Sequence, residues 1–390
     1  MAHGSGNAPR AKSRQWAPRL WAGCSVRTWW RLLRRHRFAV EPPYLYIALI
    51  DTIVSVLNSA LAGIERIVYG RKIARAAIAP DPIFVIGHWR SGTTLLHELL
   101  CLDPGHGSPT AYQCLAPHHF VLTERILPRL LRFLLPGRRP IDEMELAWGS
   151  VFEDEFALCL LGARSPYESI AFPNTCPMQP ALLAHDALTP AESSAWRELL
   201  VAFMRKLSVA HAGRRLVFKS PPHTCRLRVL VDMFPGARFV HIVRHPYAVF
   251  PSTVHLWRTL HRAQGLQRPR EDGLDEAVLS TFEYVHACLE RDRSLVAPRH
   301  FHELRYEDLL GDPVGELQRL YRQLQLDEPP ALRTSVEAYF SARADYRTNR
   351  FQLSADERAT LTRRWGHVMS RYGYDSAPDS VSAPSSAAIT

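Results

Sequence analysis

The residues best suited to chemistry lie in one short stretch, Gly87-His88-Trp89-Arg90-Ser91-Gly92-Thr93-Thr94. Two glycines bound a loop that contains an arginine, and two threonines follow the second glycine. Between a strand and a helix, such a loop presents backbone N–H groups and a positive helix N-terminus to an anion. The stretch therefore predicts a phosphate-binding loop, since a tight turn without a ligand would need neither the arginine nor the hydroxyl groups.

This loop has the glycine spacing of the triphosphate-binding motif G-x-x-x-x-G-K-[ST], but its charge is placed differently. Thr93 stands at the position of the lysine, and the positive charge lies inside the loop, at Arg90. We therefore expect the loop to hold a phosphate, but not the triphosphate end of ATP with magnesium.

Two further groups of cations and hydroxyls follow later apolar runs. One is Lys219-Ser220-Pro221-Pro222-His223, and the other is Arg244 with Ser252 eight residues later, on the expected next helix. Ligands of open α/β sheets bind outside the carboxyl ends of the strands. We therefore expect both groups to meet the loop at one edge of a sheet, where they would suit a ligand with two separate anionic groups.

These positions require strands that alternate with helices. Apolar runs bounded by Gly, Pro or polar residues predict four strands, at 83–86, 215–219, 237–243 and 302–306. Two of the expected helices begin with capping boxes, at Thr189-Pro190-Ala191-Glu192 and at Ser354-Ala355-Asp356-Glu357. The alternation predicts an α/β fold with a mainly parallel central sheet flanked by helices.

Together these stretches resemble those of bacterial-type sulfotransferases that use 3′-phosphoadenosine 5′-phosphosulfate (PAPS). The resemblance covers roughly residues 65–375 and rests on R-S-G-T-T, on K-S-P-P-H, on the Arg244–Ser252 pair and on Arg305-Tyr306-Glu307-Asp308-Leu309. It implies a core like that of P-loop nucleotide triphosphatases. It also implies transfer of a sulfuryl group from PAPS to a hydroxyl or amine of a small-molecule, lipid or glycan acceptor.

The resemblance implies a role for each matching residue. Residues 90–94 would bind the 5′-phosphosulfate, Arg244 and Ser252 the 3′-phosphate, and Tyr306 would lie near the adenine. Lys219, with Arg90, would stabilise the leaving phosphate and the sulfuryl group during transfer. Sulfuryl transfer, like phosphoryl transfer, depends mainly on positioning and charge stabilisation. Because a sulfuryl group carries less charge than a phosphoryl group, arginine and lysine suffice and no metal site is expected.

The acceptor hydroxyl needs a general base, and three residues are candidates. His223 follows Lys219 by four residues, past two prolines that predict an extended, rigid loop. The base histidine of animal cytosolic sulfotransferases follows the lysine by two residues. Glu153 and Glu155 lie in a predicted helical segment, 149–161. The sequence leaves the choice among the three open.

Residues 105–185 are expected to supply much of the acceptor pocket. Their aromatic residues suggest an aromatic or lipid-like acceptor: Tyr112, Phe120, Phe152, Tyr167 and Phe172. They do not distinguish a glycolipid, a sterol, a phenol or a carbohydrate.

Charge is distributed unevenly along the 390 residues. The formal net charge is +10, and residues 1–40 hold nine arginines and lysines and no acidic residue. The rest of the chain is nearly neutral, which argues against a nucleic-acid partner. Because the basic residues alternate with four tryptophans, we expect 1–43 to be a flexible arm or to contact an anionic membrane surface.

The remaining segments predict the domain organisation and the cellular compartment. A helical extension is expected at 44–80, where Asp51 and Asn58 favour a packed helix over a membrane span. The sulfotransferase-like domain would cover 81–375, and 376–390 would be a disordered tail. Seven dispersed cysteines without metal-ligand spacing, and the absence of an apolar secretory segment, predict a cytoplasmic protein, peripheral at most to the inner face of a membrane.

Two other functions are compatible with parts of the sequence. A nucleotide kinase or ATPase would need a loop lysine and an acidic magnesium ligand at a strand end, and neither is found. A non-catalytic membrane-surface protein would need none of the polar groups at the strand ends. Glu307 and Asp308 are interpreted as capping or ion-pairing residues rather than as a metal pair.

Overall fold

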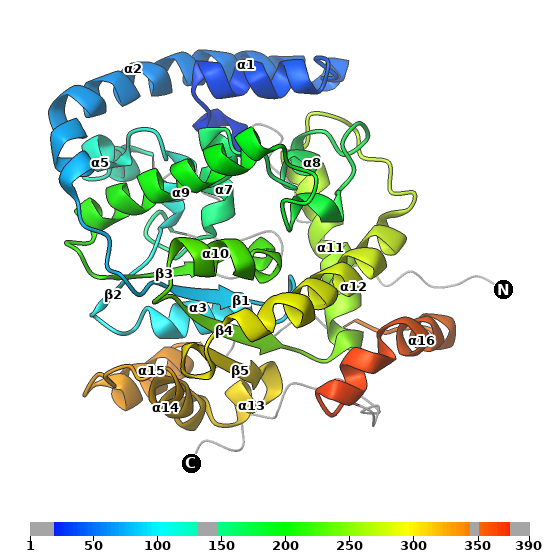
Figure 1. The fold of residues 1–390 in the computed structure, drawn as a ribbon. Helices are drawn as coiled ribbons and strands as arrows, with labels where there is room; N and C mark the ends of the chain where they lie inside the picture. The colour runs from blue at the N-terminus through cyan, green and yellow to red at the C-terminus, as the bar shows by residue number, and fades with distance from the viewer. Residues whose placement is uncertain (1–18, 132–146, 344–350, 375–390) are drawn as a thin grey trace.

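The computed structural model describes residues 19–131, 147–343 and 351–374 (Figure 1). The first part of the expected N-terminal arm and the expected disordered tail at 376–390 lie outside these residues.

Five parallel strands form the central sheet, in the order β2-β3-β1-β4-β5. The strands are β1 Ile83–Ile86, β2 His106–Gly107, β3 Arg215–Lys219, β4 Arg238–Val243 and β5 Phe301–Arg305. The four predicted strands and the parallel α/β class are therefore confirmed. The two-residue strand β2 was not predicted, because it is too short to show a period and lies among glycines and prolines.

The central strand β1 is buried on both faces, as its continuous apolar sequence requires. Its alternate residues enter two different cores. Phe84 packs with aromatic residues of β3, β4 and the α9 side of the sheet, whereas Ile83 and Val85 pack with aliphatic residues of β3, β4 and α3. The sheet is thus a rigid layer whose strand ends are held in register.

Helices cover both faces of this sheet (Figure 1). After β1 they are α3 Thr93–Leu100, α4 Ala111–Leu115, α5 Phe120–Thr123, α6 Leu127–Leu130, α7 Asp154–Leu161, α8 Glu168–Ala171, α9 Pro190–Ala210, α10 Leu227–Met233, α11 Pro246–Gln264, α12 Leu274–Asp292, α13 Tyr306–Gly311, α14 Pro313–Gln323, α15 Leu332–Ser341 and α16 Ala355–Arg371. Both predicted capping boxes are present, at the starts of α9 and α16. In Figure 1, α7, α9 and α10 lie on one side of the sheet and α14 and α15 on the other.

The N-terminal elements pack as an outer layer over α7 and α9 (Figure 1). They are a short 3-10 turn, Leu20–Gly23, followed by α1 Val26–Arg35 and α2 Leu45–Arg75. Trp21 and Trp29 are buried, and their indole N–H groups donate to the Gln264 carbonyl at 3.0 Å and to Thr52 Oγ1 at 2.9 Å. Residues 19–43 are therefore folded against the body, and the expectation of a flexible arm is wrong for them. Composition alone does not distinguish an indole that anchors in a core from one that reaches a membrane.

The segment Pro42–Arg75 is long and apolar enough to cross a membrane by length and composition. The helix α2 nevertheless packs along the body through one side, where it contacts α1, α5 and α9. This agrees with the expectation of a packed helix within the extension 44–80, and the helix ends at residue 75.

Candidate functional site

The loop between β1 and α3 is held in a conformation that only glycine adopts readily at two positions. Gly87 and Gly92 have φ angles of +144° and +103°, and Arg90 between them has φ +67°. A Cβ atom at position 92 would lie 2.3 Å from the Tyr306 ring, and one at position 87 would lie 2.5 Å from the Ile242 carbonyl oxygen. The loop is thus pressed against β4 and α13, and α3 begins directly after it. The first N–H groups of such a helix have no partner within the helix and are available to an anion.

Four of the predicted donor-binding residues gather beside this loop, although they come from four different segments. Arg90 Nε donates to Ser252 Oγ on α11 at 2.9 Å. The Arg244 guanidinium lies 4.5 Å above the centre of the Tyr306 ring and donates to the Arg90 carbonyl at 3.5 Å. Arg244 and Ser252 therefore meet the loop as predicted, and the phosphate that each would bind stays a prediction.

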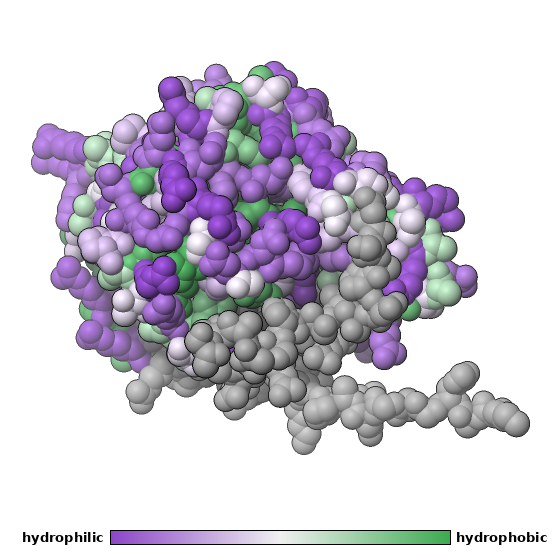
Figure 2. Space-filling view, turned by 90° about the horizontal axis from the view of Figure 1, so that it is seen from below, coloured by the Kyte–Doolittle hydropathy of each residue, from purple (hydrophilic) through white to green (hydrophobic). Residues whose placement is uncertain are grey.

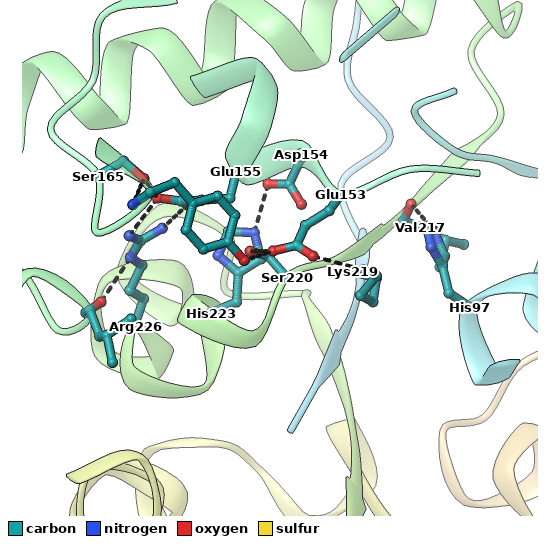
Figure 3. Close-up of polar contacts among 12 residues, drawn as sticks. His97, Glu153, Asp154, Glu155, Ser165, Val217, Lys219, Ser220, His223 and Arg226 are labelled. Atoms are coloured by element: carbon teal, nitrogen blue, oxygen red, sulfur yellow. Dashed lines mark hydrogen bonds and ion pairs between the residues drawn. The ribbon is translucent and has the colours of Figure 1, made fainter. Parts of the chain in front are cut away.

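Lys219, the last residue of β3, is paired with the carboxylate of Glu153, the residue that precedes α7 (Figure 3). Its Nζ atom lies 2.8 Å from Glu153 Oε2, and both side chains are largely buried. The other carboxylate oxygen, Oε1, accepts hydrogen bonds from the Tyr167 hydroxyl and, at 3.3 Å, from Ser220 Oγ. Burial, and next the nearby Glu153 charge, raise the pKa of Tyr167 well above its ordinary value, so its phenol stays protonated and donates. Of the three predicted bases, Glu153 is therefore the one that the structure brings to the lysine.

His223 points away from Lys219 and into the core (Figure 3). Residues Pro221–Cys225 form a 3-10 helix, in which the His223 N–H donates to the Ser220 carbonyl at 3.0 Å. The expected extended loop is therefore wrong. A proline φ near −65° also suits the first turn of a helix, so two prolines alone do not impose an extended chain. The imidazole is fully buried, and its Nε2 atom lies 2.7 Å from Asp154 Oδ2. This burial counts against His223 as a base for an acceptor.

Glu155 forms a fully buried ion pair with Arg226. Two guanidinium N–H groups donate to its two oxygens, at 2.5 and 3.1 Å, and Ser165 Oγ donates to Oε1 at 2.6 Å. Every oxygen of Glu155 thus has a partner in the core. The structure assigns this carboxylate to packing, contrary to the expectation that it could be the base.

The three consecutive carboxylates 153–155 therefore pair in order with Lys219, His223 and Arg226 (Figure 3). Neighbouring residues at a helix start point about 100° apart, so three adjacent acids cannot share one partner. Asp154 and Arg226 were not predicted as parts of the site, and Tyr167 was expected only among the aromatic residues of the acceptor pocket. A run of three acids directly before an apolar helix is a signal that could have found Asp154, because buried carboxylates need partners.

The aromatic residues expected in the acceptor pocket divide into two groups. Phe120 and Phe172 are fully buried in the core, where Phe172 stacks on His36 at a centroid distance of 4.6 Å, and Tyr112 is also buried. Phe152 is only half-buried beside Glu153, and Tyr167 contacts Glu153 directly. Of the five, only Phe152 retains substantial exposed surface, whereas Tyr167 is as buried as Tyr112 and reaches the site through its contact with Glu153.

No group of three or more His, Cys, Asp or Glu side chains within the described ranges is arranged to hold a metal ion. Glu307 accepts hydrogen bonds from the His245 N–H at 3.0 Å and from the Tyr374 hydroxyl at 2.6 Å. Asp308 lies 3.8 Å from the Arg305 guanidinium. Asp308 thus forms the expected local ion pair, whereas Glu307 joins segments that are more than 60 residues away in sequence.

Comparison with known proteins identifies relatives of this chain. A sequence model described as the sulfotransferase family matches residues 82–330. The omega-hydroxy-beta-dihydromenaquinone-9 sulfotransferases Stf3 of Mycobacterium bovis and Mycobacterium tuberculosis are 45% identical to the chain over 362 residues, which are 93% of each chain.

Two solved structures have a similar fold at low sequence identity. The sulfotransferase STF1 of Mycobacterium tuberculosis aligns with a TM-score of 0.64 and 17% identity, over 88% of this chain and 92% of its own. STF9 of Mycobacterium avium also aligns with a TM-score of 0.64, at 19% identity, over 90% and 97% of the two chains. Both likenesses support the P-loop-like α/β fold.

Proposed function

The chain belongs to the sulfotransferase family, and on this premise we propose that it transfers the sulfuryl group of PAPS to the terminal hydroxyl of a quinone lipid. The acceptor class is suggested by the name of the 45% identical relative, which acts on a hydroxylated dihydromenaquinone. The identity extends over 93% of both chains, so it includes the segments that surround Glu153 as well as the donor loop. The half-buried Phe152 beside Glu153 suits an apolar acceptor.

The pairing of Lys219 with Glu153 is the observation that supports the proposal best, because it unites a cation and a candidate base at the carboxyl end of β3. PAPS would supply an activated sulfuryl group whose leaving group is a phosphate. Residues 90–94 would hold the 5′-phosphosulfate, and Arg244 and Ser252 the 3′-phosphate, with the adenine near Tyr306.

Each residue would then have one task in the transfer. Glu153 takes the proton of the acceptor hydroxyl while the oxygen of that hydroxyl forms a bond to the sulfur atom. The bond between sulfur and the phosphate oxygen breaks on the opposite side, and the Lys219 ammonium stabilises the negative charge that develops on that oxygen. Tyr167 and Ser220 orient the Glu153 carboxylate through its other oxygen.

The donor is tested by thermal denaturation of the chain with 3′-phosphoadenosine 5′-phosphate or with ATP and magnesium. Stabilisation by the former is expected, and Arg244→Ala should abolish it. Stabilisation by ATP and magnesium alone would instead support a nucleotide kinase or ATPase.

The acceptor is tested by incubation with PAPS and a ω-hydroxylated menaquinone, a sterol, a simple phenol or a sugar, followed by mass spectrometry of the products. We expect sulfation of the quinone lipid, and large losses of turnover in Lys219→Ala and Arg90→Ala. Sulfation of another hydroxyl alone would contradict the acceptor but not the transfer. Normal function of both variants in cells would favour a non-catalytic membrane-surface protein.

A further inference from the structure

The helix α2 exposes an apolar stripe along most of its length. Ten of the seventeen exposed large hydrophobic side chains in the described part of the chain are on this helix. They are Leu45, Tyr46, Leu49, Ile50, Ile53, Val56, Leu57, Ile64, Ile67 and Val68. Their spacing of three and four residues puts them on one side of the helix, over about 35 Å at 1.5 Å per residue. Stripes of this size mark contact surfaces.

The opposite side of α2 is polar, and it is the side that is buried. Apart from Ile47, its buried residues are Asp51, Ser55, Asn58 and Glu65. Asn58 Nδ2 donates to the Ala22 and Cys24 carbonyls at 2.7 and 2.9 Å. Glu65 pairs with Lys206 at 2.6 Å and accepts from the Leu122 N–H at 3.1 Å. The helix is therefore amphipathic with its apolar side outward, the reverse of a helix that covers a soluble core.

Every exposed charge on α1 and α2 is positive. The exposed cations are Arg27, Arg31, Arg34, Arg35, Arg66, Arg71, Lys72 and Arg75. The acidic residues of α2, Asp51 and Glu65, are both buried. Trp30 of α1 and Phe38 of the segment between α1 and α2 are also exposed, in edge-to-face contact with ring centroids 5.2 Å apart. Apolar and aromatic side chains fringed by cations suit the interface of an anionic bilayer.

We propose that the outer side of α2, with Trp30 and Phe38 of the neighbouring segment, lies in the headgroup region of an anionic lipid bilayer. The helix would lie in the plane of the membrane rather than cross it, because Asn58 and Glu65 bind it to the body along its length. A second copy of the chain is a weaker candidate, since a two-fold contact through this surface would bring the same cations together.

This proposal differs from the sequence-based expectation in the residues that contact lipid. That expectation assigned the contact to the basic, tryptophan-rich segment 1–43, but Trp21 and Trp29 are buried, and most of the exposed apolar surface lies on α2, with only Trp30 and Phe38 of that segment beside it in the proposal. Nor is the apolar stripe a general property of the surface. Figure 2 shows the molecule from below, where hydrophilic residues predominate in the described part and hydrophobic ones appear in small areas between them. The α1–α2 layer also covers α7, the helix that Glu153 precedes, so docking would bring a membrane to the side of the sheet that holds this carboxylate.

Vesicle flotation of the full chain tests the proposal without donor or acceptor, so that its outcome is independent of the proposed reaction. We expect the parent to float with phosphatidylglycerol–phosphatidylcholine vesicles, less at high salt, and weakly with phosphatidylcholine alone. The double variant Ile53→Asp/Leu57→Asp should lower the affinity by about tenfold or more. Arg71→Glu/Lys72→Glu should lower binding to the anionic vesicles only.

The matched control is Leu295→Asp, which places the same charge at an exposed leucine away from α2 and should bind as the parent does. A cooperative urea denaturation transition like that of the parent shows that each variant is folded. Failure of the parent to float, or equal flotation of Ile53→Asp/Leu57→Asp, would overturn the proposal. A parent that sediments as a dimer, with a monomeric Ile53→Asp/Leu57→Asp variant, would overturn it in favour of a second copy.

Discussion

Glu153 differs from the two carboxylates that follow it in what it can reach. Its side chain retains a small exposed fraction and contacts the terminal ammonium of Lys219, whereas Asp154 and Glu155 have no exposed surface. A base that receives a proton from an incoming acceptor must be reachable by that acceptor. Three adjacent carboxylates thus have different roles, because each is paired with a different side chain.

Glu153→Gln should lower kcat by about 10²–10⁴-fold, because the amide keeps the size of the side chain but cannot take the acceptor proton. Single-turnover sulfation with saturating PAPS measures this change. Thermal stabilisation by 3′-phosphoadenosine 5′-phosphate should be unchanged. Glu124→Gln is the matched control, since Glu124 bonds only to Gln113 among its described partners. An unchanged kcat in Glu153→Gln would show that another group is the base.

Glu155→Gln should act on stability rather than on the chemical step. It leaves the buried Arg226 guanidinium without its carboxylate, which costs about 3–5 kcal/mol in the free energy of unfolding. Urea denaturation measures the loss, and Glu155→Gln/Arg226→Met should recover part of it. If Glu155→Gln were as stable as the parent but inactive, the packing role of Glu155 would be wrong.

At the scale of elements, the loop between β1 and α3 depends on glycine because three elements meet there. β1 ends, α3 begins, and the Tyr306 ring of α13 covers the backbone at position 92. A ligand phosphate can approach such a backbone only if no side chain intervenes. In the α2 helix the contacts between elements are polar rather than steric. Its polar side is buried because the groups that it contacts on the body are polar.

Gly92→Ala should weaken binding of 3′-phosphoadenosine 5′-phosphate by at least about tenfold, since the new methyl group would press on Tyr306 and strain a positive φ. Isothermal titration calorimetry measures the affinity. Gly366→Ala on α16 is the control, because a Cβ there meets nothing within 4 Å. It should leave binding unchanged and add about 0.5–1 kcal/mol of stability. Equal affinities of Gly92→Ala and the parent would contradict the role of this close contact.

Asp51 should make the attachment of α2 dependent on pH. Burial raises the pKa of its carboxyl from 3.8 to about 7. Between about pH 4 and 7 the folded protein holds a proton that the unfolded chain has lost, so this group lowers the unfolding free energy as pH rises through that range. Asp51→Asn removes the effect.

The stability of Asp51→Asn relative to the parent should therefore rise from pH 4 to 7, by up to about 4 kcal/mol. Urea denaturation at several pH values measures the difference. Asp232→Asn, at an exposed ion pair with Arg197, serves as the control and should follow the parent closely. Parallel pH profiles of Asp51→Asn and the parent would refute the raised pKa.

At the scale of the whole molecule, the N-terminal layer is part of the folded unit. The chain before β1 returns across the body, and Leu20 N donates to Gln264 Oε1 at 2.8 Å, more than 240 residues away in sequence. Trp29 is buried between α1 and α2, while the adjacent Trp30 is 57% exposed. Of these two neighbouring tryptophans, Trp29 therefore stabilises the packing of the layer, whereas Trp30 belongs to its outer surface.

Trp29→Ala should lower the free energy of unfolding by about 3–5 kcal/mol, because it leaves a cavity and removes the hydrogen bond that the indole donates to Thr52 Oγ1. Trp30→Ala should change it by less than about 0.5 kcal/mol. Chemical denaturation compares the two variants directly. Similar losses in both, or in neither, would show that residues 19–43 do not stabilise the body as the structure implies.

The order of residues within short stretches of the sequence was enough to predict much of the fold and the loop between β1 and α3. The loop of residues 87–94, the four longer strands and the two capping boxes each depend on residues a few positions apart, and each was predicted correctly. The errors concern segments whose local sequence is compatible with two arrangements. Two prolines suit both an extended loop and the start of a 3-10 helix, and a basic tryptophan-rich segment suits both a membrane and a core.

The sequence by itself thus determined the parallel α/β class, the family resemblance and the glycine-bounded loop between β1 and α3, because short-range spacing specifies them. Only the tertiary structure decided which of three adjacent carboxylates faces Lys219, since the partners are 66 residues apart and each acid points in a different direction. It also decided that α2 turns its polar side inward. Periodicity identifies the two sides of a helix, but only the packing of the rest of the chain determines which side is buried.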